Sequence, residues 1–313
     1  MTAQCGWYLD QIEHSTPTPM KPAPSLHDRL LAEISAFIRS TDNSLANDAG
    51  DPAFAEPLVG FARGDDPIFA RYKDVVGPFH WTPLEAFREA FPDRTIEADE
   101  ITVISWILPH TERTKHDNRR ETLYPSESWA RARFFGETVN DALRRRVVDF
   151  FLGETIAALA PVLLPTWSRK DSDRFVWAST WSERHQAYAA GLGTFGLCDG
   201  LITPKGKAMR VGAVVAATAD LPVSPRPYDD HHAYCLFYST GTCRACIERC
   251  PVGAISEQGH DKRLCRDHVH RTANAHVKEQ YGFDGYGCGL CQTGVPCESG
   301  IPVAKQAGAK HPS

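Results

Sequence analysis

Cysteine is the residue type whose number and spacing in this chain point most directly to chemistry. The chain has ten cysteines, and eight of them fall between Cys235 and Cys297. The first residues, Met1 to Asp10, contain no basic stretch followed by an apolar core, so we expect no export signal and a cytoplasmic location. Disulfide frameworks belong to oxidising compartments, whereas clustered thiols in a reducing compartment are typical of metal sites. The cysteine cluster therefore predicts bound metal.

The first half of the cysteine cluster follows an iron–sulfur pattern. It reads Cys243-Arg-Ala-Cys246-Ile-Glu-Arg-Cys250-Pro251, which is C-x2-C-x3-C-P. Bacterial two-cluster ferredoxins carry C-x2-C-x2-C-x3-C-P, and the cysteine before their proline binds the other cluster. Eight thiols are available for two [4Fe–4S] clusters once the others are added, which are Cys235, Cys265, Cys288, Cys291 and Cys297.

Two departures from the ferredoxin pattern bear on the ligand set. Thr240 stands where the first cysteine of the motif is expected, and Cys235 is the nearest substitute. The second run closes with five residues between Cys291 and Cys297, where the motif has three. If Cys235 is not a ligand, one cluster lacks a thiolate or is a [3Fe–4S] cluster. The ferredoxin crossover would give one cluster Cys235, Cys243, Cys246 and Cys297, and the other Cys250, Cys265, Cys288 and Cys291.

A pair of zinc sites is the alternative, because C-x2-C also suits tetrahedral zinc. The Cys-Pro dipeptide and the total of eight thiols favour iron–sulfur clusters. Cys5, near the N-terminus, is expected to be a free thiol. With eight thiols present, four histidines are expected to be solvated or hydrogen-bonded rather than ligands: His231, His232, His268 and His270.

The rest of the chain is expected to form an arm and a core. Prolines are frequent in residues 1–60, which we expect to form an N-terminal arm with an amphipathic helix over 26–40. Residues 61–227 are expected to form the core. The Pro-rich stretch 221–227 then separates this core from a two-cluster ferredoxin-like domain, 228–313. A chain of 313 residues suits such a division, at roughly 100–200 residues per domain.

The core combines strand and helix patterns, which predicts an α+β or α/β fold. Residues 101–108 are nearly all apolar or β-branched, which predicts a buried strand. Residues 111–125 are polar and charged, and we expect a surface loop there. After Pro125, an apolar stripe from Phe135 to Phe151 predicts a long helix. Shorter patterns predict strands at 175–178 and 211–217 and a helix at 183–190.

An ordered set of motifs resembles that of the epoxyqueuosine reductase and reductive dehalogenase superfamily. The set begins with Glu183-Arg184 and the glycine run Ala190-Gly-Leu-Gly-Thr-Phe-Gly196. Leu201-Ile-Thr-Pro204, Gly206, an apolar strand and the two-cluster pattern follow. The similarity covers roughly residues 100–300. It implies a nitroreductase-like α/β core that binds base-off cobalamin, with two [4Fe–4S] clusters that feed electrons to it.

The glycine run is then the expected cobalamin site. Glycines would let the backbone approach a large cofactor and present bare N–H groups to it, whereas a tight turn without a ligand is the alternative. Cys198 stands where the family more often has a polar residue. It is either a lower ligand or redox thiol of the cofactor, or a small buried hydrophobe. The residues expected at the cofactor are Gly191, Gly193, Thr194, Phe195, Gly196, Leu197, Cys198, Leu201, Thr203 and Pro204.

The proton donor of the family is missing from this chain. Epoxyqueuosine reductases have a catalytic Asp in a Gly-x-Asp-Tyr-His motif, but Thr138 and Asn140 stand here in place of the Asp and the His. Neither side chain donates a proton near neutral pH. We expect His110, which follows the strand at 101–108, to be the catalytic proton donor, and an exposed loop histidine is the alternative. Reduction of epoxyqueuosine by the family's route is therefore not expected.

These features predict a cobalamin-dependent iron–sulfur oxidoreductase that reduces a small substrate. Two alternatives are an electron-transfer protein that reduces the corrinoid of a partner protein, and a ferredoxin-like relay without cobalamin. An external electron donor, such as a ferredoxin, a flavodoxin or a reductase, is expected as a partner. The net charge of −5 argues against a nucleic-acid partner, and no apolar run is long enough to span a membrane.

Overall fold

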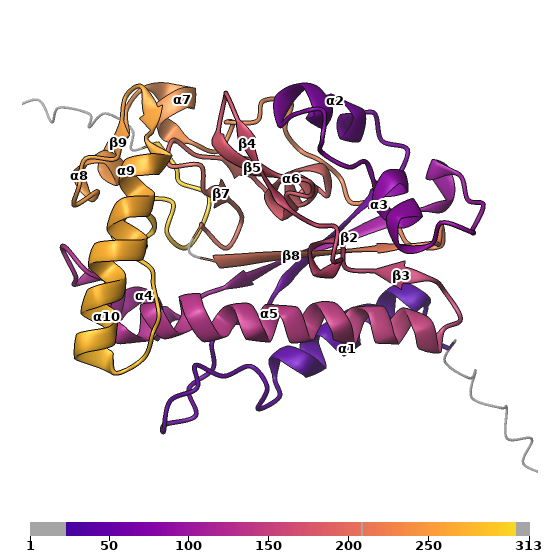
Figure 1. Cartoon of the computed structure of the whole chain (residues 1–313), viewed down its shortest axis with the longest axis horizontal. Coiled ribbons are helices and arrows are strands. Elements are labelled where there is room, and N and C mark those ends of the chain that lie inside the picture. The colour runs from indigo at the N-terminus through magenta and orange to yellow at the C-terminus, as the bar shows by residue number, and fades with distance from the viewer. Residues whose placement is uncertain (1–22, 208, 305–313) are drawn as a thin grey trace, which may run out of the picture.

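A computed structural model describes residues 23–207 and 209–304, and it shows helices on both faces of a four-stranded sheet (Figure 1). The strand order is β1-β2-β8-β3, and every neighbouring pair is antiparallel. Strand β2 is buried along its whole length, as its continuous apolar run predicts. The mixed helix-and-sheet class is thereby confirmed. The strands are β1 (Leu58–Arg63), β2 (Thr102–Pro109), β8 (Met209–Ala216) and the short β3 (Ala158–Leu159).

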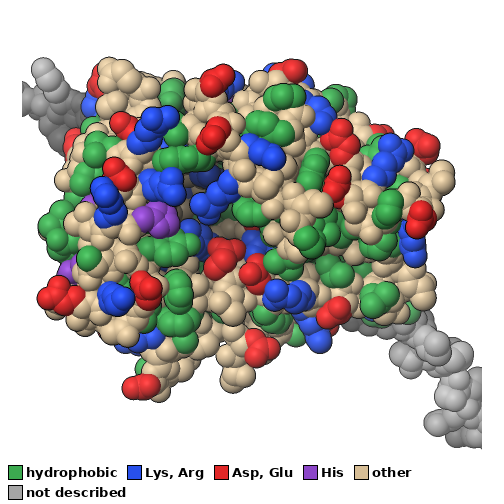
Figure 2. All heavy atoms as spheres, viewed as in Figure 1, with side chains coloured by type: hydrophobic (Ala, Val, Ile, Leu, Met, Phe, Trp, Pro, Cys, Tyr) green, Lys and Arg blue, Asp and Glu red, His purple; other side chains and the backbone are tan. Residues whose placement is uncertain are grey.

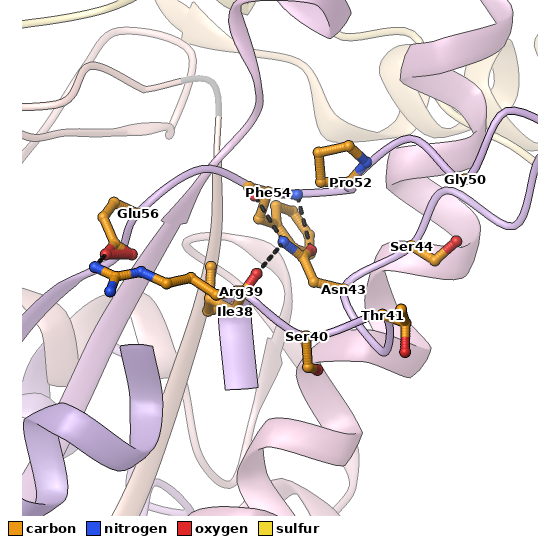
Figure 3. A pocket seen from close by; sticks show the side chains of 10 residues that line it. All are labelled: Ile38, Arg39, Ser40, Thr41, Asn43, Ser44, Gly50, Pro52, Phe54 and Glu56. Atoms are coloured by element: carbon orange, nitrogen blue, oxygen red, sulfur yellow. Dashed lines mark hydrogen bonds and ion pairs between the residues drawn. The ribbon is translucent and has the colours of Figure 1, made fainter. Parts of the chain in front are cut away.

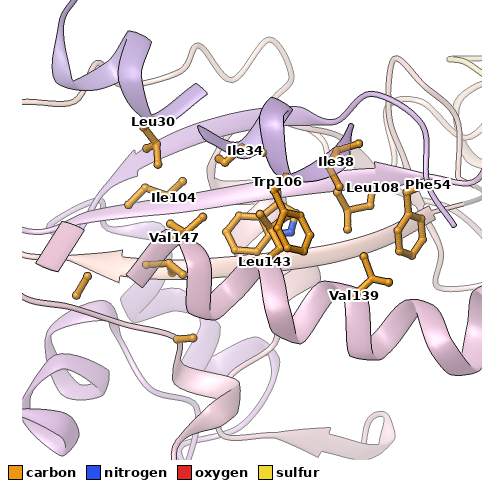
Figure 4. Packing of buried hydrophobic residues seen from close by; sticks show 14 of the residues in the cluster. Leu30, Ile34, Ile38, Phe54, Ile104, Trp106, Leu108, Val139, Leu143 and Val147 are labelled. Atoms are coloured by element: carbon orange, nitrogen blue, oxygen red, sulfur yellow. The ribbon is translucent and has the colours of Figure 1, made fainter. Parts of the chain in front are cut away.

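Two helices cover one face of the sheet and form the larger core with it. They are α1 (Leu26–Ile38) and α5 (Glu127–Gly153), and both were predicted from their apolar stripes. Figure 4 shows how Ile34 of α1 and Leu143 of α5 pack with Trp106 of β2. The helix from the predicted N-terminal arm is therefore part of the main hydrophobic core.

Three shorter helices cover the opposite face. Phe69, Phe87 and Ala187, one from each helix, pack there in a second buried cluster with Ile107 of β2. The last of these helices was predicted from the sequence, and it carries Glu183 at its start. The helices are α2 (Ile68–Val75), α3 (Pro83–Ala90) and α6 (Glu183–Ala189).

The polar stretch after β2 contains a helix, α4 (Glu112–Arg119), where a surface loop was expected. The hydroxyl group of Thr111 accepts a hydrogen bond from the backbone N–H of Thr114 and caps the first turn. The buried face of α4 is polar and consists of Thr114, Lys115 and Asn118. The loop prediction was wrong because this helix buries hydrogen-bonding groups instead of an apolar stripe.

Two small hairpins follow α5 and precede β8 along the chain. The strand predicted at 175–178 is confirmed within the first hairpin. The second hairpin carries the glycine run and, in its turn, Cys198. The hairpins pair β4 (Arg169–Ser172) with β5 (Val176–Ser179), and β6 (Thr194–Phe195) with β7 (Leu201–Ile202).

The part of the chain that carries the eight clustered cysteines, described over residues 228–304 and named here the cysteine segment, forms short elements. They gather at one end of the molecule, beside α4 and one end of α5 (Figure 1). The connection to this segment runs along β1, where the backbone N–H of Ser224 donates to the Phe61 carbonyl at 3.0 Å. In the part of the chain that the structure describes, no helix is both long and apolar enough to cross a membrane. The elements are α7 (Leu236–Thr240), α8 (Ala245–Glu248), β9 (Ile255–Ser256), β10 (Gly259–His260), α9 (Lys262–Asp267) and α10 (Asn274–Tyr281).

Candidate functional site

Buried thiols gather where the cysteine segment meets the β6–β7 hairpin. Cys235, Cys246 and Cys297 are each 8% exposed, and they pack in one cluster with Leu197 and Ile202 of the hairpin. The sequence assigned all three thiols to one predicted iron–sulfur cluster. The structure therefore brings three residues of that set together, from well-separated parts of the segment.

A fourth thiol of this group comes from the core. Cys198, in the turn between β6 and β7, is 7% exposed and belongs to the same packed cluster. Hydrogen bonds with Cys246 and Cys291 lower the pKa of the Cys198 thiol well below its usual range. We name Cys198, Cys235, Cys246 and Cys297 the first thiol group.

A buried ammonium group lies beside the first thiol group. Lys207 is 3% exposed, and its Nζ lies 3.3 Å from the Sγ of Cys198. Burial alone would lower the pKa of Lys207, but the negative charges of Cys198 and Cys297 outweigh burial and raise this pKa well above its usual range. Lys207 therefore places a positive charge beside the sulfur of Cys198 in the first thiol group.

The turn that carries Cys198 is anchored to the cysteine segment. The carboxylate of Asp199 pairs with Nδ1 of His260 at 3.1 Å and with Nζ of Lys262 at 3.5 Å. Asp199 has a φ of 58°, in the left-handed region that few non-glycine residues occupy. Burial would lower the pKa of His260, but hydrogen bonds with Asp199 and Cys265 raise it to about 10. The charged histidine and lysine thus hold the turn against the segment.

The other ligand candidates form a second group. Cys250, Cys265 and Cys288 are half-buried, and burial, together with the two neighbouring thiols, raises the pKa of Cys288 to about 11. Cys291 lies between the groups: it packs against the first thiol group, and its pKa is raised by a hydrogen bond with Cys198, by burial and by the charge of Cys288. We name Cys250, Cys265, Cys288 and Cys291 the second thiol group, which is the set that the sequence assigned to one cluster.

Helices α4 and α5 hold the loop of the second thiol group. The side-chain amide of Asn118 donates to the Cys288 carbonyl at 3.2 Å and to Thr293 Oγ1 at 3.1 Å. Gly289 has a φ of 69°, and a side chain there would overlap the indole ring of Trp129. The polar face of α4 and the first turn of α5 therefore contact this loop and fix its position.

The chemistry of the two groups fits iron–sulfur ligation. Cys243 is half-buried and lies in neither group. No set of three or more His, Cys, Asp or Glu side chains in residues 23–207 and 209–304 is arranged to hold a single metal ion. The donors are instead all thiols, gathered in two neighbouring groups beside a buried ammonium. Soft thiolates are the protein ligands of iron–sulfur clusters, so these residues suit that cofactor.

The glycine run packs against the chain's own backbone. A side chain on Gly193 would overlap the Ile202 carbonyl, and one on Gly191, where φ is 75°, would overlap the Pro225 carbonyl. The Gly193 N–H donates to the hydroxyl of Tyr228 at 3.2 Å. These glycines are therefore explained by a tight turn, which is the alternative that the sequence left open.

Most other residues expected at the cofactor are also enclosed by protein. Thr194 Oγ1, for example, accepts a hydrogen bond from the Tyr234 N–H at 2.9 Å. Phe195 is half-buried and Pro204 is exposed. The buried members of the set are Thr194, Gly196, Leu197, Cys198, Leu201 and Thr203.

A hollow opens on the face of the molecule shown in Figure 2, near the middle of the view. Lys and Arg side chains line much of its rim, with acidic side chains on one side. Comparison with Figure 1 places it over the region where β7, the start of β8 and the cysteine segment meet.

A second hollow, of about 660 Å³, lies between the end of α1 and the start of β1 (Figure 3). Asn43 spans its wall by donating to the carbonyls of Ile38 and Phe54, each at 2.8 Å. Its lining contains no Cys or His, so it offers no ligand for a metal cluster.

His110 is a core residue, not an exposed one. It is 3% exposed and packs between the rings of Phe54 and Trp129, with centroids at 5.5 Å and 4.6 Å. Burial lowers its pKa to about 3, so the imidazole is neutral at pH 7. A general acid needs a pKa near the working pH. The position supports neither the expected catalytic role nor the exposed-loop alternative.

The two residues that replace the family's Asp and His have different surroundings. Thr138 is exposed on α5. Asn140 is fully buried, where its Oδ1 accepts from Trp106 Nε1 and its Nδ2 donates to the Val211 carbonyl, both at 2.9 Å. Asn140 therefore joins α5 to the sheet.

A carboxylate that the sequence motifs did not single out lies next to Thr138. Glu137 is half-exposed and pairs with Arg144 at 3.1 Å and with Arg210 at 3.5 Å. Arg144 is 2% exposed and also pairs with Glu183. Burial raises the pKa of Glu183, and the nearby charge of Arg144 only partly opposes this rise. The motif residue Glu183 thus belongs to a buried ion-pair network that links α5 and α6.

The four other histidines considered as ligands have different partners. His232 Nδ1 lies 2.8 Å from the Phe195 carbonyl and His268 Nε2 lies 3.1 Å from the Leu123 carbonyl. His231 packs on His232, and His270 stacks on a tyrosine ring. His232 and His268 are thus hydrogen-bonded, as the sequence predicted. Cys5 lies outside the described residues.

The sequence of this chain is similar to that of epoxyqueuosine reductases. The protein of that name from Bacillus anthracis is 29% identical over 126 residues, which cover 38% of this chain and 30% of the relative. The one from Staphylococcus aureus is 28% identical over 188 residues, 58% of this chain and 43% of the relative. The chain thus spans less than half the length of these relatives. No protein-family model matches it.

Solved structures overlay on the chain only loosely. A catabolic reductive dehalogenase in complex with 3-bromo-4-hydroxybenzoic acid gives a TM-score of 0.47 at 14% identity, over 88% of this chain and 36% of that one. An epoxyqueuosine reductase with an epoxyqueuosine-modified tRNA stem loop gives 0.43 at 18% identity, over 88% and 67%. The sequence matches, at 28–29% identity, confirm the resemblance to epoxyqueuosine reductases that the motifs indicate.

Proposed function

We propose that this chain, a divergent relative of the epoxyqueuosine reductases, is an iron–sulfur oxidoreductase that passes electrons from two clusters to a corrinoid. The observation that carries the proposal is the convergence of two all-thiol groups at the junction of core and cysteine segment. The first thiol group lies next to the β6–β7 hairpin, and the second lies against α4 and α5, so both groups contact the core. In this proposal electrons pass from the second group to the first and then to the corrinoid.

The proposal assigns a task to each part of the chain. Residues 228–313 act as a two-cluster ferredoxin-like domain, residues 61–227 as a nitroreductase-like core, and residues 1–60 as an arm whose helix completes that core. When bound, the clusters would supply single electrons, and a corrinoid would supply the chemistry for reducing a small substrate. The residues of the chain hold the ligands, exclude water from the first thiol group, and balance its charge with Lys207.

The corrinoid belongs in the hollow of Figure 2 rather than in the glycine turn, because the turn is filled by the Ile202 and Pro225 carbonyls. The basic rim of the hollow suits a cofactor or substrate that carries negative charge. An external ferredoxin, flavodoxin or reductase would supply electrons on the side of the second thiol group. The clusters need a reducing environment, which the cytoplasm provides.

A relay without its own corrinoid is the second candidate. The tight packing of Gly191 and Gly193 favours it, as does the absence of an acidic side chain at Thr138. Such a protein would reduce the corrinoid of a partner protein or another acceptor.

One cobalamin-retention experiment separates these candidates. Anaerobically purified protein is mixed with cobalamin, desalted, and examined by visible spectroscopy beside a heat-denatured control. A corrinoid band that stays with the protein supports the enzyme. Iron–sulfur absorption without a retained corrinoid band contradicts it and supports the relay.

A further inference from the structure

The ferredoxin loop leaves the first thiol group short of ligands. Thr240, at the position of the first motif cysteine, is exposed, and its hydroxyl donates to the Leu236 carbonyl at 2.8 Å. Cys243, at the second motif position, is only half-buried and lies outside the first thiol group. Of the three motif positions that normally supply ligands to one cluster, only Cys246 packs within the buried first thiol group.

Two other thiols take up the vacant positions. Cys235 precedes α7 and is 8% exposed, and Cys198 comes from the β6–β7 turn of the core and is 7% exposed. Both pack with Cys246 and Cys297 in one cluster. We propose that Cys198 is a ligand of the first iron–sulfur cluster, and that Cys235, Cys246 and Cys297 complete its ligand set. This inference rests on the proposed iron–sulfur function and deepens it.

The surroundings of Cys198 are built to hold its side chain in place. Asp199, the next residue, adopts a left-handed conformation and is fixed by His260 and Lys262. A strained conformation persists only where the surrounding structure imposes it, and such positions are common at ligand sites. The backbone N–H of Lys207 donates to the Cys297 carbonyl at 3.0 Å, which ties the next loop of the core to the same ligand set.

The ligation step is balanced within the site. Cys198 binds iron as a thiolate, its proton having passed to solvent, and no electron is transferred. The ammonium group of Lys207, 3.3 Å from this sulfur, offsets the added negative charge. A ligand from the core would fix the cluster at the domain junction, so that electron transfer to the core needs no rearrangement.

Iron content after anaerobic cluster reconstitution tests this assignment. Wild-type protein, Cys198→Ala and Cys198→Ser are compared for iron and acid-labile sulfide per folded chain, and for the electron paramagnetic resonance spectrum of the reduced protein. We expect Cys198→Ala to lose about half of its iron, since one cluster of two is lost. Cys198→Ser, with an oxygen ligand, should keep iron with an altered spectrum or lose the same half.

Two controls separate ligation from packing. Leu197→Ala removes a buried side chain from the same turn and should keep both clusters, because Leu197 has no donor atom. Cys243→Ala removes a thiol from the ferredoxin motif and should also keep both clusters. Full iron content with an unchanged spectrum in Cys198→Ala would overturn the assignment, and so would equal iron loss in Leu197→Ala or cluster loss in Cys243→Ala. Wild-type protein without iron would instead contradict the proposed function.

Discussion

Trp129 fills the space that a side chain on residue 289 would occupy. Gly289, between the second-group thiols Cys288 and Cys291, lies against the indole with a φ of 69°. Trp129 in turn packs on His110, whose ring centroid is 4.6 Å away. The loop of the second thiol group is therefore seated on the hydrophobic core through one aromatic contact.

Gly289→Ala is expected to displace this loop and to disturb the second thiol group. The new Cβ would overlap the indole, and alanine pays a further penalty of about 1 kcal/mol in the left-handed region. Iron retention after desalting should fall by about half, while the first cluster's spectrum persists. Gly253→Ala is the matched control, since its φ is 65° and nothing lies within 4 Å of its added Cβ. Full iron content in Gly289→Ala would contradict the seating role of Trp129.

His110→Phe is expected to make the stability of the protein less sensitive to acid. The pKa of His110 is lowered to about 3 in the fold, against about 6.5 when unfolded. The unfolded state therefore takes up more protons below pH 6.5, and stability falls as pH decreases through this window. Between pH 7 and pH 5 the loss from this residue is about 2 kcal/mol. Urea unfolding of metal-free wild-type and variant protein at the two pH values measures this loss of unfolding free energy. The same pH dependence in both proteins would contradict the burial of a neutral His110.

Lys207→Gln is expected to lower the reduction potential of the first cluster. Reduction adds negative charge, which the buried ammonium beside Cys198 stabilises. Removal of this charge therefore makes reduction less favourable. A tenfold effect on the equilibrium corresponds to about 59 mV for one electron, and we expect a decrease of at least this size in a redox titration. Lys205→Gln serves as control because its ammonium group donates to the Glu56 carbonyl at 2.8 Å. A potential that rises or stays constant in Lys207→Gln contradicts this role.

Glu183→Ala is expected to destabilise the fold by about 3–5 kcal/mol, the usual cost of breaking a buried ion pair. Its Oε1 accepts hydrogen bonds from Arg144 Nε and the Ala213 N–H, each at 2.9 Å. Loss of Glu183 would leave a largely buried guanidinium group with fewer partners. Glu127→Ala breaks an exposed pair with Arg131 and should change stability by less than about 1 kcal/mol. Urea unfolding of both variants tests this, and similar costs would refute the structural role of Glu183.

Apolar periodicity predicted the parts of the fold that bury apolar faces. Strand β2, helix α5 and helix α1 each pack such a face into the core, so the spacing of their apolar residues predicts each element. Helix α4 buries Thr114, Lys115 and Asn118 instead, and its hydrogen-bond partners become visible only when the cysteine segment is in place. A method based on apolar spacing has no means to detect it.

The sequence predicted the cysteine segment as the source of ligands, but it assigned Cys198 to the corrinoid or to the buried hydrophobic residues. The Cys246 and Cys250 positions follow from a known spacing. Cys198 joins the first thiol group only through folding, because the β6–β7 turn meets the cysteine segment in space. The glycines at 191 and 193 did indicate a close approach, but sequence alone could not show that the approaching group is the chain's own carbonyl.

The metal content of anaerobically purified protein tests the central claim most directly. Two [4Fe–4S] clusters on the two thiol groups predict about eight iron atoms and about eight inorganic sulfides per chain, with visible absorption that bleaches on reduction. Cys246→Ala and Cys265→Ala should each remove about half of the iron and leave the other half. Stoichiometric zinc with negligible iron and sulfide would contradict the account, because the thiol groups would then be structural metal sites with no electrons to transfer.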